Sequence, residues 1–132
     1  MKAFFDTNVL VAAVTSDTDR SRNAIRLLNE VDNGYTSIVN VMELRSVLAK
    51  KKLFEQDRID RIEDRIARKT TVVFPDASDI IAANNIQRDL LLYPLDAIVL
   101  AAAKTVDCPL VSFDSELLEH EAIEPNKLLD SE

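Results

Sequence analysis

Lys2-Ala3-Phe4-Phe5-Asp6-Thr7-Asn8-Val9-Leu10 is the stretch that decides the fold. Its apolar run predicts a buried strand that ends at a carboxylate, and the second run, from Val9 to Val14, predicts a short helix. Further strands are expected over residues 35–39, 70–74 and 109–112, with helical patterns between them. Strands separated by helices predict a parallel sheet covered on both faces. We therefore expect a three-layer α/β/α sandwich with a central, mainly parallel sheet, in one domain spanning residues 1–132.

The expected helices follow from the spacing of apolar residues. Asp19 or Ser21 can cap the first long helix, and Gly34 is expected to end it. The helix after Leu95 is apolar on almost every face, so we expect it to be buried. This first long helix runs from the cap to Gly34, with its apolar residues between 24 and 31, and the later helices are expected at 40–50, 56–68, 78–88, 95–106 and 115–119.

Rare residue types exclude several classes of chemistry. The chain has one Gly (Gly34), one His (His120), one Cys (Cys108) and no Trp. A single Gly excludes a glycine-rich phosphate loop, and one Cys excludes a disulfide framework. One His and one Cys cannot build a zinc site of the usual types. Any enzymatic chemistry must therefore come mainly from carboxylates.

Bulk composition places the chain among globular proteins. Apolar residues make up 47% and charged residues 30% of the 132 residues, which is typical of neither a disordered tail nor a membrane protein. No apolar run approaches the ~20 residues of a spanning helix, and a signal-peptide pattern is absent. We expect no membrane association and a cytoplasmic location.

Five carboxylates occupy positions where chemistry is expected. In an open parallel sheet, ligands bind beyond the carboxyl ends of the strands. Asp6 and Asp114 follow the first and last strands, while Glu43 and Asp96 lie in the first turns of apolar helices; Glu116 follows shortly after Asp114. Each could instead cap a helix or belong to a solvated turn, so the residues taken singly leave both roles open.

Four motifs, in this order, resemble those of the PIN-domain family. They are Asp6-Thr7-Asn8-Val9-Leu10, Val41-Met42-Glu43-Leu44, Leu95-Asp96-Ala97-Ile98-Val99-Leu100-Ala101-Ala102-Ala103 and Leu110-Val111-Ser112-Phe113-Asp114. Each motif is short, but together they cover residues 4 to about 116. The resemblance implies a metal-dependent nuclease whose acidic cluster holds Mg²⁺ or Mn²⁺.

The resemblance also assigns roles to individual residues. All-oxygen ligands without His or Cys suit Mg²⁺ or Mn²⁺ better than zinc. Ser112 stands where Thr is common in the family, and Glu116 stands where a further acidic residue is often found and could be an additional metal ligand. The implied catalytic and metal-binding residues are Asp6, Glu43, Asp96 and Asp114, supported by the polar residues Asn8 and Ser112.

In size, the chain resembles the small VapC-type toxins of this family. This resemblance implies an endoribonuclease that is the toxin of a type II toxin–antitoxin system. It also implies an RNA substrate, an antitoxin that blocks the site, and a homodimer. A non-catalytic RNA- or protein-binding module and a housekeeping RNA-processing nuclease remain alternatives. A haloacid-dehalogenase-type phosphatase with Asp6 as nucleophile would need an Asp where Asn8 stands.

The charge distribution allows a nucleic-acid partner despite a net charge of −7. Nine of the 16 basic residues lie between 43 and 69, whereas residues 107–132 alone carry a net −7. The basic segment could guide phosphates, or it could be a solvated face with the ion pairs Asp57–Arg61 and Asp64–Arg68. The candidate RNA-binding residues are Arg45, Lys50, Lys51, Lys52, Arg58, Arg61 and Arg65.

Overall fold

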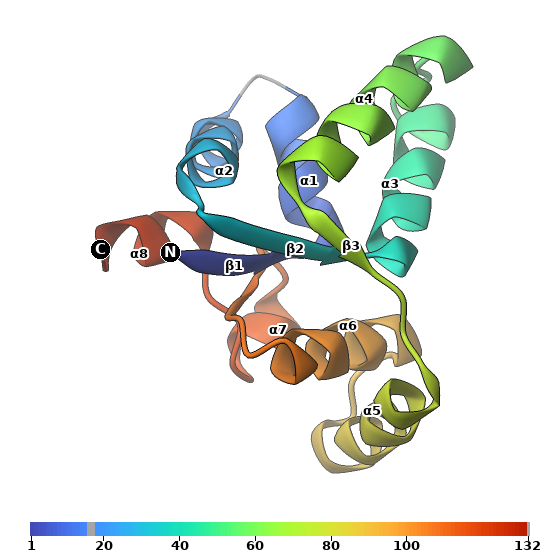
Figure 1. Cartoon of the computed structure of the whole chain (residues 1–132), viewed down its shortest axis with the longest axis vertical. Helices are drawn as coiled ribbons and strands as arrows, with labels where there is room; N and C mark the ends of the chain where they lie inside the picture. The colour runs from blue at the N-terminus through green and yellow to red at the C-terminus, as the bar shows by residue number, and fades with distance from the viewer. Residues whose placement is uncertain (16–17, 132) are drawn as a thin grey trace.

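A parallel four-stranded sheet forms the centre of the computed structural model, which describes residues 1–15 and 18–131 (Figure 1). The strand order is β3-β2-β1-β4, and every neighbouring pair is parallel. The expected α/β class is thus confirmed. The strands are β1 (Lys2–Phe5), β2 (Asn33–Ser37), β3 (Thr71–Val73) and β4 (Leu110–Val111).

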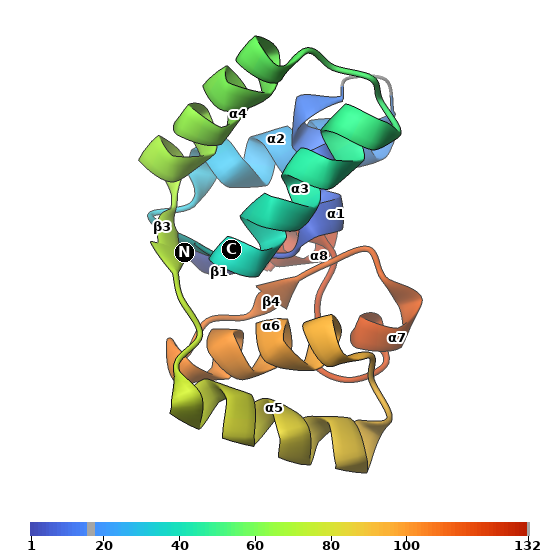
Figure 2. The same ribbon diagram turned by 90° about the vertical axis from the view of Figure 1, so that its right-hand side faces the viewer.

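Helices cover both faces of the sheet, which confirms the three-layer sandwich. Figures 1 and 2 show α1–α4 on one face and α5–α7 on the other. The final helix, α8, contacts α2. The bounds are α1 (Thr7–Val14), α2 (Asp19–Glu30), α3 (Ile38–Lys50), α4 (Gln56–Lys69), α5 (Ala77–Leu90), α6 (Pro94–Thr105), α7 (Ser115–Leu118) and α8 (Pro125–Asp130).

Strand β1 contributes side chains to both halves of the core. Ala3 and Phe5 join a cluster with residues of α1–α4, whereas Phe4 joins a second cluster with α5, α6 and Leu110 of β4. The side chains of Ala3, Phe4 and Phe5 are fully buried, as expected of a central parallel strand, whereas Lys2 at its start is exposed. The two clusters therefore fix the carboxyl end of β1, and Asp6 is the next residue.

Gly34 does not end a helix, contrary to the expectation from sequence. Helix α2 ends at Glu30, and Gly34 lies within β2, opposite Ala3 of β1. A Cβ atom on Gly34 would lie 3.3 Å from the Lys69 carbonyl oxygen, the Phe5 ring and a Val31 methyl group. The close approach of these neighbours, rather than a helix C-cap, accounts for the glycine.

Within the described residues, no helix is both long and apolar enough to cross a bilayer. The longest helices, α4 and α5, have 14 residues each, well short of the ~20 that a spanning helix needs.

Candidate functional site

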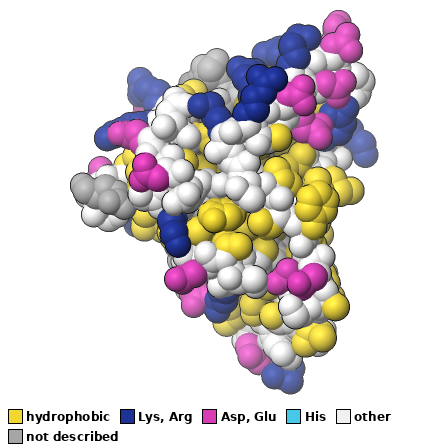
Figure 3. Space-filling model, viewed as in Figure 1, with side chains coloured by type: hydrophobic (Ala, Val, Ile, Leu, Met, Phe, Trp, Pro, Cys, Tyr) yellow, Lys and Arg dark blue, Asp and Glu magenta, His cyan; other side chains and the backbone are white. Residues whose placement is uncertain are grey.

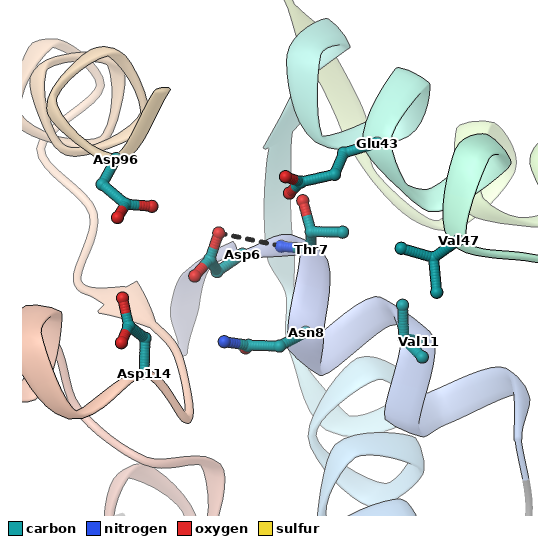
Figure 4. Close-up of a pocket in the computed structure, with 8 residues that line it drawn as sticks. All are labelled: Asp6, Thr7, Asn8, Val11, Glu43, Val47, Asp96 and Asp114. Carbon is teal, nitrogen blue, oxygen red and sulfur yellow. Dashed lines mark hydrogen bonds between the residues drawn. The ribbon is translucent and has the colours of Figure 1, made fainter. Parts of the chain in front are cut away.

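Four carboxylates from four separate segments surround one pocket of about 410 Å³ (Figure 4). Asp6 follows β1 and Asp114 follows β4, so both lie beyond the carboxyl ends of strands. Asp96 lies in the first turn of α6, as expected, whereas Glu43 lies in the second turn of α3, because that helix begins at Ile38 rather than at Asn40. The structure thus brings these four predicted residues together. The full lining consists of Asp6, Thr7, Asn8, Val11, Glu43, Val47, Asp96 and Asp114.

Asp6 is buried at the base of the pocket, and both of its carboxylate oxygens are hydrogen-bonded. The backbone N–H of Thr7 donates to Oδ1 at 2.9 Å, so Asp6 also serves as the N-cap of α1. The Ser112 hydroxyl donates to Oδ2 at 2.7 Å. The helix-capping role considered from sequence therefore coexists with a place in the pocket, and the two bonds fix the carboxylate.

Asn8 and Ser112 connect the start of α1 to the end of β4. The Asn8 side-chain amide donates to the Ser112 hydroxyl at 3.2 Å and accepts from the Phe113 backbone N–H at 3.1 Å. The Asp114 backbone N–H donates to the same hydroxyl at 3.0 Å. These bonds set the positions of Asp6 and Asp114 relative to one another, a supporting role like that implied for Asn8 and Ser112.

A buried polar network lies behind the pocket, and the sequence patterns do not predict it. The Thr7 hydroxyl donates to Asn40 Oδ1 at 2.9 Å. The Asn40 amide in turn donates to the Phe5 carbonyl at 3.0 Å and to the Thr36 hydroxyl at 3.3 Å. Asn40, 2% exposed, thus joins α3, which carries Glu43, to the end of β1. The one sequence signal for this network is Asn40 itself, a polar residue that stands between Val39 and Val41.

The electrostatics of the pocket oppose four ionised carboxylates. Burial raises the pKa of Asp6; the Ser112 and Thr7 hydrogen bonds lower it, and the nearby Glu43 and Asp114 raise it further. Burial, followed by the charges of Asp6, Asp114, Glu43 and Glu116, raises the pKa of Asp96 to about 6. Perturbed carboxylates that converge on a pocket are typical of functional sites.

The donor set fits a hard divalent cation that keeps part of its hydration shell. Among residues 1–15 and 18–131, no three Asp, Glu, His or Cys side chains are close enough to hold one ion by themselves. Mg²⁺ commonly binds through one or two carboxylates and retains several waters. A pocket of about 410 Å³ lined by oxygen ligands has room for such a hydrated ion. A cation would also relieve the repulsion that raises the pKa of Asp96.

Glu116 lies outside the pocket lining. Its side chain is exposed, and its backbone N–H donates to Asp114 Oδ1 at 3.3 Å. The Glu116 charge nevertheless contributes to the raised pKa of Asp96. Glu116 therefore acts on the pocket from its edge.

The predicted basic residues do not enter the carboxylate pocket. Arg45 of α3 pairs with Asp60 and Glu63 of α4, and thus ties these two helices together. Arg58 stacks on Phe54, with 3.8 Å from its guanidinium carbon to the ring centroid. Arg61 and Arg65 line a separate concavity on α4, together with Asp64 and Arg68. The three lysines at the end of α3 are exposed: Lys50, Lys51 and Lys52. The ion pairs Asp57–Arg61 and Asp64–Arg68 are not formed among the described residues.

We expect Asp96→Asn to stabilise the metal-free protein at neutral pH. The pKa of Asp96 is raised to about 6 in the folded state, so folding takes up a proton, and stability falls as pH rises from about 4 to about 6. The amide removes this cost, which we put at about 1–2 kcal/mol for a half-buried group. Thermal unfolding in EDTA should show a higher Tm for the variant at about pH 7.5 and little difference at about pH 4. A lower Tm at both pH values would contradict this account of Asp96.

Comparisons with known proteins place this geometry in a family. The PIN domain family model matches residues 3–122. No curated protein sequence matches the chain. Among solved structures, a toxin–antitoxin complex from Klebsiella pneumoniae aligns with a TM-score of 0.76 at 21% identity, covering 93% of this chain and 97% of that one.

Two further structures are similar at comparable coverage. VapC20 from Mycobacterium tuberculosis, described as a sarcin-ricin loop cleaving toxin, aligns with a TM-score of 0.73 at 19% identity over 92% of this chain and 97% of that one. DNA-bound VapBC from Salmonella typhimurium aligns with a TM-score of 0.71 at 18% identity over 94% and 96% of the two chains. These structural likenesses show the fold. Because the family match spans nearly the whole sequence, the chain belongs to the PIN domain family.

Proposed function

We propose that the protein is an endoribonuclease that hydrolyses RNA phosphodiester bonds at an acidic Mg²⁺ or Mn²⁺ site. The observation that carries the proposal is the convergence of Asp6, Glu43, Asp96 and Asp114 on one pocket. Family membership supports a nuclease, and the toxin neighbours support RNA as the substrate.

Six residues in and around the pocket have roles in this proposal. Asp6, Glu43, Asp96 and Asp114 would hold the hydrated metal ion together, one or two of them directly and the others through its waters. The ion when bound supplies activation of the attacking water and charge neutralisation on the phosphate. Ser112 holds Asp6 in place by its 2.7 Å hydrogen bond, and Asn8 fixes the segment that carries Asp114. Neutralisation of the carboxylates lets an anionic phosphate approach a pocket that would otherwise repel it.

RNA cleavage tests the proposal directly. Purified ribosomal and transfer RNA incubated with the protein and Mn²⁺ should yield discrete fragments. EDTA should abolish the cleavage, and Mn²⁺ added in excess over EDTA should restore it. Asp96→Asn should lose this cleavage although it is expected to be more stable. Undiminished cleavage in EDTA, or by Asp96→Asn, would refute the metal mechanism.

The toxin of a type II toxin–antitoxin system is the specific biological role that we propose. The Klebsiella neighbour is described as a toxin–antitoxin complex and the Salmonella neighbour as DNA-bound VapBC, which supports a cognate antitoxin. A groove of about 290 Å³ between α1, α2 and α4 could take an amphipathic acidic segment of such a partner. Two cations, Arg65 and Lys69, line this groove together with apolar side chains. The apolar residues are Ala13, Val14, Ile25, Leu28, Ile62 and Ile66.

A small reading frame beside this gene that encodes a DNA-binding antitoxin would support the toxin role. Coexpression should then yield a stable complex, and Lys69→Glu with Ile25→Asp should weaken it while leaving RNA cleavage by the free protein intact. Lack of such a frame, together with cleavage of a single RNA precursor, would favour the housekeeping nuclease instead.

A homodimer is also part of the proposal. Large apolar side chains are exposed in the segment from 74 to 95, which includes α5, and a second copy of the chain would remove them from water. Light scattering should give a dimer, and Phe74→Ser with Leu91→Ser should shift it to a monomer. The exposed residues are Phe74, Ile80, Ile81, Leu91, Tyr93 and Leu95.

We assign the RNA path to basic side chains of α3 and α4. Figure 3 shows Lys and Arg side chains gathered over the upper part of the molecule, in the region of α4, with acidic side chains among them. Arg58, Arg61 and Arg65 are exposed, whereas Arg45 contributes less because Asp60 and Glu63 neutralise it. Lys50, Lys51 and Lys52 extend the basic surface from the end of α3.

Charge reversal of three arginines tests this path. Arg58→Glu, Arg61→Glu and Arg65→Glu combined should weaken RNA binding and reduce the slope of log K against log salt by about 2–3, because each lost phosphate contact removes about 0.7–0.9. The matched control is charge reversal of Arg26, which pairs with Glu30 on α2. An unchanged salt slope in the triple variant would exclude the path.

A non-catalytic RNA- or protein-binding module is the second candidate function. Such a module should bind RNA without cleaving it and gain no thermal stability from Mn²⁺. An aspartyl-phosphate trapped on Asp6 would instead revive the phosphatase alternative.

A further inference from the structure

Arg20 lies in the first turn of α2, and its side chain is exposed. Its guanidinium carbon lies 4.8 Å from the centroid of the Phe113 ring, an arrangement typical of cation–π stacking. Because α2 and the segment after β4 are far apart in sequence, this contact joins two distant parts of the chain. Neither residue was singled out as a candidate RNA-binding residue from the sequence.

Phe113 immediately precedes Asp114 of the acidic pocket, and its backbone is fixed there. It stands between Ser112, which hydrogen-bonds Asp6, and Asp114, which lines the pocket. Its own backbone N–H donates to the pocket residue Asn8 at 3.1 Å, and its ring packs against the core cluster of α1–α4. The Phe113 backbone is thus anchored to a pocket residue, and its ring holds the Arg20 guanidinium next to the segment that carries Asp114.

Arg20 differs from its neighbours on α2 in having no carboxylate partner among the described residues. Arg22 pairs with Asp19, and Arg26 pairs with Glu30 at 2.7 Å. A guanidinium that stacks through its face keeps its N–H edge free, and that edge matches the geometry of a phosphate. The Phe113 stack thus holds a cation, unpaired among the described residues, next to the segment that carries Asp114.

We propose that Arg20 is a substrate-binding residue that contacts an RNA phosphate next to the scissile bond and positions that bond over the carboxylates. The inference rests on the proposed nuclease function and adds a phosphate contact from α2, on a different helix from the basic residues of α3 and α4. Phe113 is the positioning residue for this contact. The competing explanation is structural: the stack merely ties α2 to the segment after β4.

Three variants separate these explanations. Arg20→Met keeps an unbranched apolar chain over Phe113 but removes the charge, and Arg20→Lys keeps the charge but loses the planar fork. Arg22→Met removes one positive charge from the same helix and is the matched control. Each full-length protein is tested for cleavage of purified transfer and ribosomal RNA with Mn²⁺, for the salt dependence of RNA binding, and for Tm.

We expect Arg20→Met to lose about ten- to a hundredfold in kcat/KM and to reduce the slope of log K against log salt by about 1, with an unchanged Tm. Arg20→Lys should recover part of the loss, and Arg22→Met should behave as wild type. Wild-type kinetics in Arg20→Met, or an equal loss in Arg22→Met, would overturn the inference while the nuclease function stands. Wild-type protein that cleaves no RNA with Mn²⁺ would overturn the nuclease function, and this inference with it.

Discussion

Asp6→Asn should reduce RNA cleavage by on the order of 10³-fold or more, because it removes a charge at the base of the proposed metal site. Asp6 is 6% exposed and receives hydrogen bonds on both oxygens, so no other side chain can take its place without rearrangement. The measurement is single-turnover cleavage of RNA with saturating Mn²⁺. The variant should also lose the gain in stability from Mn²⁺, about 2.7 kcal/mol for wild type at a hundred times Kd.

A matched control distinguishes this loss from a general effect of charge. Asp19→Asn removes one carboxylate that pairs with Arg22 on the surface of α2, and it should leave cleavage unchanged. The Asn side chain at position 6 can still accept the Thr7 N–H bond, so the fold should persist. Cleavage by Asp6→Asn within about threefold of wild type would remove Asp6 from the chemistry.

Phe5→Ala should destabilise the protein by about 3–5 kcal/mol, the largest change in stability that we expect from a single substitution. The Phe5 ring is fully buried in the cluster with α1–α4 and lies against the position of Gly34 in β2. Its removal leaves a cavity directly before Asp6. Urea unfolding followed by circular dichroism gives the free energy of unfolding.

Phe74→Ala is the control of the same residue type. Its side chain is 69% exposed, so the free energy of unfolding should change by less than about 0.5 kcal/mol when measured at a protein concentration that keeps the chain monomeric. An equal loss in the free energy of unfolding for Phe5→Ala and Phe74→Ala would show that the buried side chain of β1 is not what fixes the site.

Much of the fold follows from the sequence because its signals are local. The apolar run before Asp6 predicts β1, and the strand–helix alternation predicts a parallel sheet with helices on both faces. Leu95 to Val106 is apolar on almost every face, and α6 is largely buried, as expected. Four of the predicted acidic residues meet in one pocket because strand ends and the N-terminal halves of the helices converge at one edge of a parallel sheet.

What the sequence did not reveal depends on contacts between distant segments. Asn40 was expected to begin a helix, yet it lies inside α3 and bonds Thr7 and the end of β1. Helix α8 was missed because the acidic tail has no extended apolar pattern; only Leu128, Leu129 and the preceding Pro125 are buried there. The Arg20–Phe113 stack joins residues from opposite ends of the chain, so no local pattern could indicate it.

Cleavage of RNA in water enriched in ¹⁸O tests most directly the claim that the four carboxylates support metal-dependent hydrolysis. With Mn²⁺, mass spectrometry of the products should find one ¹⁸O atom in each terminal phosphate monoester formed. This product should be absent in EDTA and reduced on the order of 10³-fold or more with Asp6→Asn. The attacking oxygen then comes from water. Products that end in a 2′,3′-cyclic phosphate, formed equally well in EDTA, would contradict the account, because the RNA's own 2′-hydroxyl would then be the nucleophile.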